Sequence, residues 1–426
     1  FFVTPGLRVS PPRTRGSRLD SRFHGNDEGR KETDVTQFRH PVDAIELGGI
    51  VSVRDRLIEQ QGHGRKVYRL ESGDPSFAVA PHITAALEQA LRDGQTHYTA
   101  GAGIKPLREA MFRKLCDVNR LPLESFNDVL VTNGAMNALY VAFGALCDPG
   151  DEIVMPDPTW TETADNVSLA GGVPVRAPLP FPTYHYTADV VAPLITSRTR
   201  AIVINSPHNP TGMVSTRADI EGIVRLAERH GVWVLSDEAY EHVLFDGREH
   251  VSAGALGYPK VISVFSFSKS YAMSGLRVGY VAVHDQLLLG RMAKLLRCTI
   301  NGVNSATQVA AVAALNGPQD ATREMAAEYQ LRRDALWDGL KHARLIHPVK
   351  PEGAFYMWAR IDDQWEGFEG KRGGWAMTNF LIEKAGIGSA PGEVFGPSGA
   401  GHIRFAFSCS TDQVVAAAAL LRELLA

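Results

Sequence analysis

A lysine flanked by serines and followed by an arginine is the part of this sequence best suited to chemistry. Ser266, Ser268 and Lys269 follow an apolar run, and Arg277 comes after seven further residues. An amine that loses its proton can form a Schiff base with an aldehyde, and desolvation beside a second cation lowers a lysine pKa enough to allow this. A guanidinium and hydroxyl groups suit a phosphate dianion. A surface lysine beside a structural arginine would show the same short pattern.

The sequence around this lysine alternates between apolar runs and stretches with helical spacing. The runs that we expect to form strands are 152–155, 200–205, 232–236 and 261–265, and helical spacing occurs at 50–60, 83–92, 107–115, 135–146, 220–229 and 321–340. Strands separated by helices predict an α/β fold with a mostly parallel sheet and helices on both faces. The stretch after residue 340 predicts a smaller α+β domain.

Three polar motifs fall at strand ends, at the sheet edge where open α/β sheets bind their ligands. They are VTNGAMNAL at 131–139, NSPHNPTG at 205–212 and SDEAY at 236–240. In the first motif, the free N–H groups of Ala135 and Met136 at a helix start suit a phosphate. Many α/β folds begin a helix in this way, so this motif alone is better explained as structural until it is combined with Arg277 and Ser266.

One arginine, Arg404, lies inside the apolar run at 402–408. A buried charge is costly unless it is paired, and the neighbouring chain offers no obvious acid. A ligand carboxylate is the simplest partner, because a guanidinium can bind both carboxylate oxygens in a way that lysine cannot copy. A structural ion pair is the alternative.

Length and composition set the class of protein. A chain of 426 residues is too long for one ordinary core, and a formal net charge of −3 gives no electrostatic case for nucleic acid or an anionic membrane. No apolar run approaches the roughly 20 residues that span a bilayer. The four cysteines are scattered without metal-ligand spacing. This usage favours reduced thiols in a cytoplasmic protein over disulfides or a metal site.

Taken together, the motifs resemble the class I/II aminotransferases. These are the aspartate aminotransferase-like enzymes of fold type I, which depend on pyridoxal 5′-phosphate (PLP). The resemblance rests on Ser-x-Ser-Lys at 266–269 with Arg277, on the NxPxNPTG loop at 205–212 and on DExY at 237–240. It runs from about residue 73 to residue 408, with its motifs in the family's order.

The resemblance implies a role on the cofactor for each of these residues. Lys269 would form the Schiff base, and Asp237 would keep the pyridine nitrogen protonated so that the ring can act as an electron sink. Asn209 and Tyr240 would donate hydrogen bonds to the phenolate oxygen of the ring. Trp160 would stack on the ring, although a purely structural aromatic is the alternative there.

The resemblance also implies how the cofactor's phosphate is held. Its ligands would be the backbone of Ala135 and Met136 and the side chains of Ser266, Ser268 and Arg277. The family tyrosine that matches Tyr98 reaches the phosphate of the neighbouring subunit, which implies a homodimer. A loop tyrosine without a ligand is the alternative for Tyr98. Glu238 is expected behind the site or at the surface.

For the substrate, the resemblance implies a site for the α-carboxylate of an amino acid. Arg404 would bind this carboxylate on both oxygens, with the backbone N–H of Gly73 and the side chain of Asn209 beside it. Met136 is apolar where some bacterial aspartate-specific members carry a lysine. The expected amino donors are therefore neutral, aromatic or aliphatic amino acids.

The implied activity is the transfer of an amino group between an L-amino acid and a 2-oxo acid. A C–S lyase or a decarboxylase on the same scaffold stays open, because the motifs hold the cofactor and the α-carboxylate without fixing the fate of the carbanion. A non-catalytic PLP-sensing regulator would need a DNA-binding module. Residues 1–40 have neither helix-turn-helix spacing nor strong positive charge, so this alternative ranks last.

The expected domain organisation follows from the same patterns. Residues 1–40 are rich in Arg, Pro, Gly and Ser and are expected to form a disordered tail, or to reflect a start site placed too far upstream. Residues 41–75 are expected to pack with the small domain. Residues 76–320 would form the large PLP-binding domain, and residues 321–426 the small C-terminal domain.

Overall fold

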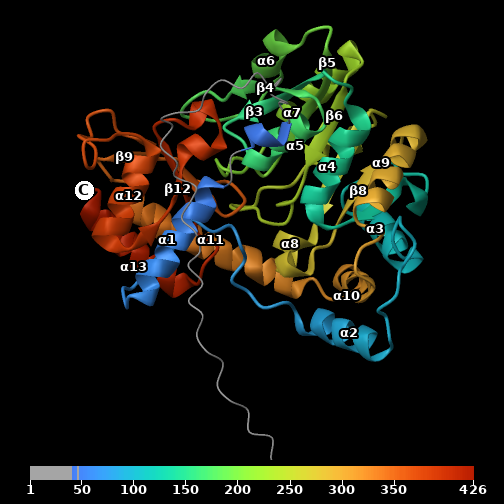
Figure 1. The fold of residues 1–426 in the computed structure, drawn as a ribbon, viewed down its shortest axis with the longest axis horizontal. Coiled ribbons are helices and arrows are strands. Elements are labelled where there is room, and N and C mark those ends of the chain that lie inside the picture. The colour runs from blue at the N-terminus through green and yellow to red at the C-terminus, as the bar shows by residue number, and fades with distance from the viewer. Residues whose placement is uncertain (1–40, 46–47) are drawn as a thin grey trace, which may run out of the picture. The chain divides into compact units, whose positions relative to one another are not determined.

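A seven-stranded sheet positions most of the chemically interesting residues (Figure 1). Its strands are β2 (Val129–Thr132), β3 (Glu152–Asp157), β4 (Val173–Pro178), β5 (Thr199–Asn205), β6 (Trp233–Asp237), β7 (Val261–Ser266) and β8 (Gly279–Val283). The spatial order is β2-β8-β7-β6-β5-β3-β4. The computed structural model describes residues 41–45 and 48–426, and the predicted tail at 1–40 lies outside this range.

The strand directions confirm the predicted mostly parallel α/β sheet. Strands β4, β3, β5, β6 and β7 pair in parallel. Strand β8 runs antiparallel to both of its neighbours, β2 and β7. The start of β8 therefore lies beside the ends of β2 and β7, at the edge where the parallel strands end.

Helices cover both faces of this sheet because alternate strand residues point to opposite sides. On one face, Ala201 and Val203 of β5 belong to a core that also holds buried residues of α4 and α9. On the other face, Ile202 and Ile204 pack with buried residues of α7. The two faces together make a sheet that is buried on both sides, as parallel sheets require.

Thirteen α-helices are found in the described residues, and α7, α8, α9 and α10 begin with a side-chain cap. They are α1 (Gly49–Gly62), α2 (Pro81–Arg92), α3 (Lys105–Asp117), α4 (Gly134–Leu146), α5 (Thr161–Leu169), α6 (Ala188–Val191), α7 (Arg217–His230), α8 (Phe267–Ser270), α9 (Gln286–Thr299), α10 (Ser305–Asn316), α11 (Asp320–Leu340), α12 (Gly374–Ala385) and α13 (Thr411–Leu424). For example, Thr216 and Asp219 form a reciprocal capping box at the start of α7, and Gly231 ends this helix at a left-handed φ of 67°.

A second, four-stranded sheet lies in the C-terminal part of the chain (Figure 1). It is antiparallel, with the order β12 (Ala390–Pro391), β13 (His402–Ala406), β10 (Tyr356–Ile361) and β9 (Ile346–Pro348). Its buried residues form one core with those of α11, α12 and α13. The short strands β1 (Tyr68–Arg69) and β11 (Ile387–Gly388) pair in parallel and connect the N-terminal segment to this region.

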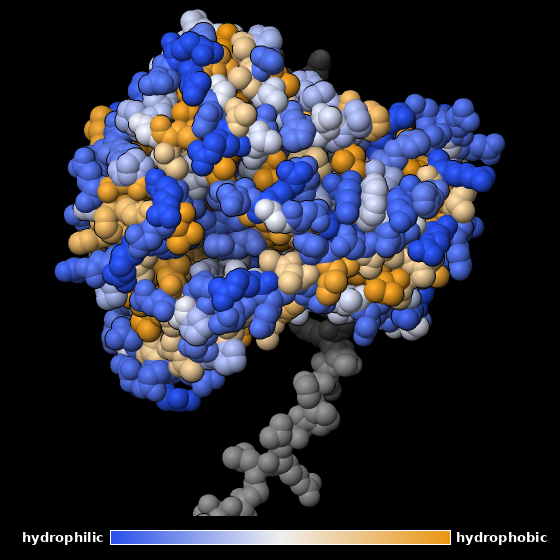
Figure 2. All heavy atoms as spheres, turned by 180° about the vertical axis from the view of Figure 1, so that it is seen from behind, coloured by the Kyte–Doolittle hydropathy of each residue, from blue (hydrophilic) through white to orange (hydrophobic). Residues whose placement is uncertain are grey.

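Residues 41–426 cluster as one unit by their contacts, so the domain limits at 75 and 320 stay predictions. Within the described residues, no helix combines the length and apolarity that crossing a bilayer needs. From behind, hydrophilic side chains are interspersed with smaller apolar areas (Figure 2). This is the usual appearance of a protein surface in contact with water.

Candidate active site

A cavity of about 300 Å³ lies at the edge where the parallel strands end. Most of the residues that the sequence predicts for the site line it: Gly73, Ala135, Met136, Trp160, Asn209, Asp237, Tyr240, Ser266, Ser268, Lys269, Arg277 and Arg404. Tyr98 does not line this cavity, and its side chain is 88% exposed. The structure therefore brings together all of the predicted site residues except Tyr98.

Lys269 lies in the short helix α8, directly after β7. The hydroxyl of Ser266 accepts the N–H of Ser268 at 3.1 Å and so starts the turn that carries the lysine. The Nζ atom of Lys269 donates to the carbonyl of Gly73 at 2.6 Å. Burial lowers the pKa of Lys269 to about 8, against the opposing effect of nearby carboxylate charge. The amine therefore has a neutral, nucleophilic fraction near neutral pH.

Arg277 and the start of α4 together form an anion cradle. Arg277 adopts a left-handed φ of 55°, and its Nη1 atom donates to the carbonyl of Ser274 at 2.7 Å. Gly134, at a φ of 78°, begins α4, and a Cβ atom there would lie 2.4 Å from Nη2 of Arg277. Only glycine lets the guanidinium approach the free N–H groups of this helix start. Among the described residues, no carboxylate pairs with Arg277.

Asp237 ends β6 and is half-buried in the cavity wall. One of its oxygens accepts the N–H of Ala239 at 3.2 Å, and none of the described lysines or arginines pairs with it. Burial raises the pKa of Asp237 to about 6, the charge of Glu238 adds to the rise, and the N–H of Ala239 opposes it. Such a carboxylate favours a partner that brings a proton or a positive charge.

Arg404, on β13, is buried to 1% exposure and lacks an anionic partner among the described residues. Its Nη1 atom donates to Oδ1 of Asn209 at 3.0 Å and its Nη2 atom to the carbonyl of Glu71 at 2.8 Å, while Nε has no partner. The structural ion pair that was the alternative for this arginine is not found in the part of the chain described. A buried guanidinium with a free N–H favours a ligand carboxylate.

Three aromatic side chains complete the described wall. Trp160 immediately precedes α5 and packs against Phe395 at 6.5 Å between ring centroids, at an interplanar angle of 44°. The hydroxyl of Tyr240 lies 2.8 Å from that of Tyr356, a residue of β10. Sequence reasoning missed Tyr356. Its only signal was a hydroxyl inside the apolar run 354–361, which by itself indicates a strand.

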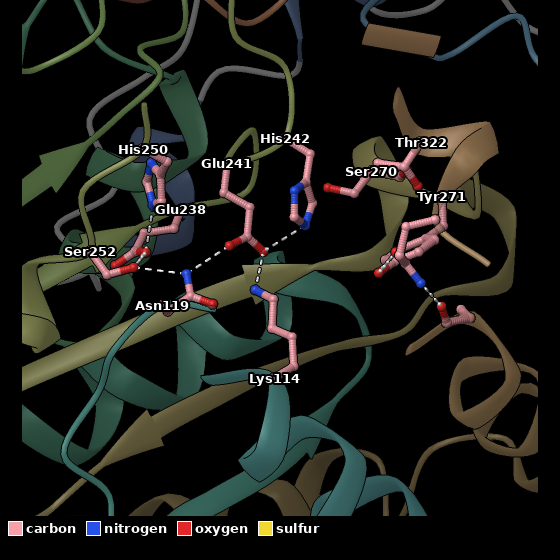
Figure 3. Close-up of polar contacts among 12 residues, drawn as sticks. Lys114, Asn119, Glu238, Glu241, His242, His250, Ser252, Ser270, Tyr271 and Thr322 are labelled. Carbon is pink, nitrogen blue, oxygen red and sulfur yellow. Dashed lines mark hydrogen bonds and ion pairs between the residues drawn. The ribbon is translucent and has the colours of Figure 1, made fainter. Parts of the chain in front are cut away.

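Behind the cavity, the loop after β6 points other side chains into a buried polar network (Figure 3). Glu238 is 1% exposed, and its Oε2 atom accepts hydrogen bonds from Nε2 of His250 at 2.7 Å and from the hydroxyl of Ser252. Glu238 was expected either behind the site or at the surface. In the structure it lies buried behind the site. We refer to Glu238, Glu241, His250, Ser252, Asn119 and Lys114 as the rear network.

Glu241 holds the other end of the rear network (Figure 3). It accepts hydrogen bonds from Lys114 at 2.5 Å and from Asn119 at 2.8 Å. Burial opposes ionisation, but Lys114 and neighbouring histidines outweigh it and lower the pKa of Glu241 to about 2. Glu238, Glu241 and His250 have potential metal-ligand atoms within 4.8 Å of one another. Hydrogen bonds and the Lys114 ammonium already engage these carboxylates, so the group is explained without an ion.

Comparison with known proteins agrees with this geometry. Residues 65–421 match the family model of aminotransferase class I and II. An aspartate aminotransferase of Bacillus sp. strain YM-2 is 33% identical over 364 residues, which cover 84% of this chain and 92% of that protein. Aromatic-amino-acid aminotransferase 2 of Thermococcus litoralis is 31% identical over 357 residues, which cover 82% of this chain and 89% of that protein.

Solved structures show the same relationship. The aspartate aminotransferase of Thermus thermophilus with maleate superposes with a TM-score of 0.83 at 33% identity, and the match covers 90% of this chain and 98% of that one. The resemblance seen in the motifs is therefore confirmed over most of the chain, and so is the predicted activity as an aminotransferase. The chain belongs to the class I and II aminotransferases, a family of PLP-dependent transaminases.

Proposed function

We propose that this chain binds PLP in the cavity and transfers amino groups from neutral L-amino acids to 2-oxo acids. One observation carries the proposal. In the sheet, β7 lies between β6 and β8, so Lys269 extends from the middle strand with Asp237 on one side and Arg277 on the other. A carboxylate and a guanidinium, each without an ionic partner among the described residues, lie on opposite sides of a reactive amine, and they match the ring nitrogen, the phosphate and the aldehyde of one small aromatic ring.

The donor set fits each part of that cofactor. The cradle of Arg277 and the α4 start, which exists only because Gly134 has no Cβ atom, suits the phosphate. Asp237 would hold a proton on the ring nitrogen, while Tyr240 and Asn209 would donate to the ring oxygen. When bound, the cofactor supplies the electron sink for the carbanion at the substrate Cα atom.

The residues of the chain then position the substrate and move its proton. Arg404 binds the α-carboxylate through the N–H groups that face the cavity, and this fixes the Cα atom relative to Lys269. The amine of Lys269 would take the proton from the Cα atom of the amino donor and pass it to the cofactor, and in the second half-reaction it would deliver a proton to the Cα atom that derives from the 2-oxo acid. In the cofactor-free chain burial lowers the pKa of this amine to about 8, and a general base works best with a pKa close to the working pH.

The cavity also supports a preference for neutral amino donors. Its apolar lining includes Ile50, Met136 and Leu139. Among the described lining residues, the only lysine and arginines are Lys269, Arg277 and Arg404, and the amine, phosphate and α-carboxylate would use all three. No cation is left in this chain's lining for the distal carboxylate of aspartate.

A half-reaction screen tests both the cofactor and the donor class. The purified protein is saturated with PLP, each amino acid is added alone, and the change in cofactor absorption is followed. We expect kcat/KM for aromatic or aliphatic donors to exceed that for aspartate by about tenfold or more. Met136→Lys serves as the matched variant, and it should raise the value for aspartate. A larger kcat/KM for aspartate than for every neutral donor in the unmodified protein would refute the preference.

The exposure of Tyr98 supports a homodimer in which each subunit completes the site of the other. Subunit complementation tests this arrangement. Lys269→Ala and Tyr98→Ala variants are unfolded together, refolded as a mixture and assayed. If Tyr98 acts in the partner's site, half of the randomly paired dimers are mixed, and one of the two sites in each mixed dimer has both Lys269 and Tyr98. About a quarter of all sites are then intact. If Tyr98 acts within its own chain or has no ligand, the mixture shows no more activity than the two variants assayed separately.

A further inference from the structure

Tyr356 is one of the residues of the cavity wall for which neither the motifs nor the proposed chemistry gives a role. It lies on β10 and is 2% exposed, yet it lines the cavity. The backbone makes room for its hydroxyl, since a Cβ atom on Gly73 would lie 2.3 Å from the Tyr356 oxygen. The same Gly73 accepts the hydrogen bond of Lys269. The Tyr356 hydroxyl is thus held at the centre of the site by the fold.

The direction of its hydrogen bond follows from counting hydrogens. The hydroxyls of Tyr240 and Tyr356 are 2.8 Å apart, and each carries one hydrogen. Burial raises the pKa of both tyrosines, so both stay protonated. If Tyr240 gives its hydrogen to the ring oxygen of the cofactor, the hydrogen between the two tyrosines must come from Tyr356. Among the described residues, the hydroxyl of Tyr240 is the only hydrogen-bond partner of the Tyr356 hydroxyl.

Packing fixes the ring of Tyr356 between the cofactor side and the carboxylate side of the cavity. Its ring packs edge-on to that of Tyr240, with centroids 5.7 Å apart. The guanidinium carbon of Arg404 lies 4.3 Å from the Tyr356 ring centroid. One residue therefore contacts both the tyrosine predicted to bind the cofactor and the arginine predicted to bind the substrate.

We propose that Tyr356 is a positioning residue that donates to Tyr240 and thereby orients and strengthens the hydrogen bond from Tyr240 to the ring oxygen of the bound cofactor. Consecutive hydrogen bonds polarise one another, so a donor to Tyr240 makes Tyr240 a better donor in turn. A stronger donor stabilises the ionised ring oxygen. This inference rests on the proposed binding of PLP, and it adds a residue that acts through Tyr240.

The test is a pH titration of the cofactor's visible absorption in four proteins: unmodified, Tyr356→Phe, Tyr240→Phe and the double variant. Loss of the Tyr356 hydroxyl should raise the pKa at which the cofactor's absorption changes by roughly 0.3 to 1 unit. The reason is that the ionised ring oxygen of the cofactor would lose stabilisation from Tyr240. Tyr240→Phe should raise it further. The double variant should match Tyr240→Phe alone, because Tyr356 has no route to the ring oxygen without the Tyr240 hydroxyl.

A matched control separates this role from a general effect of removing a buried hydroxyl. Tyr329 is fully buried in the same core, and its hydroxyl has no hydrogen-bond partner in the described part of the chain, so Tyr329→Phe should leave the absorption pKa unchanged. Because Tyr356→Phe keeps the ring beneath Arg404, KM for the amino acid should stay within about twofold while kcat falls. The unmodified protein's titration also reports whether PLP binds at all, independently of Tyr356.

Two results would overturn the inference. One is an absorption pKa in Tyr356→Phe equal to that of the unmodified protein. The other is a double variant in which the two shifts add, which would mean that Tyr356 acts on the cofactor by a separate route. A protein that develops no visible absorption with PLP would instead refute the proposed function, so the two failures are distinguishable.

Discussion

The end of β6 and the loop after it carry polar side chains on two faces. The side chains on the two faces differ in whether they have ionic partners. On the cavity face, Asp237 and Tyr240 have no ionic partner among the described residues. On the rear face, Glu238 and Glu241 are closed into the rear network by hydrogen bonds and by the ammonium of Lys114. The pKa of Asp237 is raised to about 6, whereas that of Glu241 is lowered to about 2.

The difference shows how a ligand site can be recognised without a ligand. Burying a polar group costs free energy that a native protein normally recovers with a partner. Where the partner is a neighbouring side chain, as for Glu241, the group serves the fold. Where it is missing, as for Asp237 and Arg404, the remaining cost is recovered when a ligand binds.

The largest expected effect is on the cavity face. Lys269→Ala should keep PLP bound non-covalently but lower the rate of transamination by about 10⁴-fold or more, because both the Schiff base and the general base are removed. Single-turnover kinetics with a neutral amino acid measure the loss. Lys260→Ala is the control, since that lysine is half-buried away from the cavity and, among the described residues, donates to the carbonyl of Gly231. Near-normal turnover in Lys269→Ala would remove the assignment.

Breaking the rear network should affect stability before chemistry. Glu241→Gln leaves the ammonium of Lys114 buried without a counter-charge, and this should lower the free energy of unfolding by about 3–5 kcal/mol. Urea unfolding of the cofactor-free protein measures the change, and kcat/KM of the folded fraction should stay within about threefold. Adding Lys114→Met should recover part of the lost stability. An unchanged unfolding midpoint in Glu241→Gln would contradict the distinction between the two faces.

Two buried arginines offer the same comparison with one residue type. Arg404→Lys should reduce kcat/KM for amino acids by about a hundredfold through a higher KM, because lysine cannot bind both carboxylate oxygens. Arg333 is also fully buried, but it is paired with Asp246 at 2.6 Å. Arg333→Lys should therefore lower the melting temperature and leave KM unchanged. The opposite pattern would mean that a missing ionic partner does not mark the ligand site.

The smallest expected effect is a gain in stability of the Asp237→Asn variant that depends on pH. In the cofactor-free protein, the raised pKa of Asp237 means that folding disfavours its charged form, so stability falls as pH rises from about 4 to about 6. Asp237→Asn should raise the melting temperature at pH 7 by roughly 1–3 °C and leave it unchanged near pH 4. Calorimetry of the cofactor-free protein checks this. A gain that persists at pH 4 would show that the charge is not its cause.

Glu241 should show the reverse dependence, because its pKa is lowered in the folded protein. Its contribution to stability is present above the unfolded pKa of about 4.5 and is lost as pH falls toward 2. The destabilisation caused by Glu241→Gln should therefore shrink below about pH 4. A destabilisation that is independent of pH down to pH 2 would exclude the ion pair as the source of the effect.

The site was largely predictable from sequence because its residues follow strands directly. Asp237 ends β6, and Lys269 and Arg277 flank the turn between β7 and β8, so a motif within a few residues of a strand end fixes each position. Tyr356 was not predictable. Its contact with Tyr240 depends on how the four-stranded sheet packs against the larger one, and no short sequence pattern encodes such a long-range arrangement.

The fold was predictable to a similar degree, and its errors have physical causes. The predicted helix at 83–92 begins two residues earlier in the structure because Pro81 suits the first turn of α2. Strand β4 was not predicted. It lies at the edge of the sheet, its residues are mostly half-exposed, and it contains prolines at 174 and 178, so it shows no apolar run.

The reversed direction of β8 has a mechanical consequence. Because β8 runs back along β7, the amine of Lys269 and the guanidinium of Arg277, which we propose as partners of the aldehyde and the phosphate of PLP, belong to one hairpin. Arg404 belongs to the other sheet. If one sheet moved as a rigid body relative to the other, the distance between Arg404 and Lys269 would change. The distance between Lys269 and Arg277 would stay the same. If PLP binds as proposed, such a displacement would weaken the hold on substrate and product without releasing the cofactor.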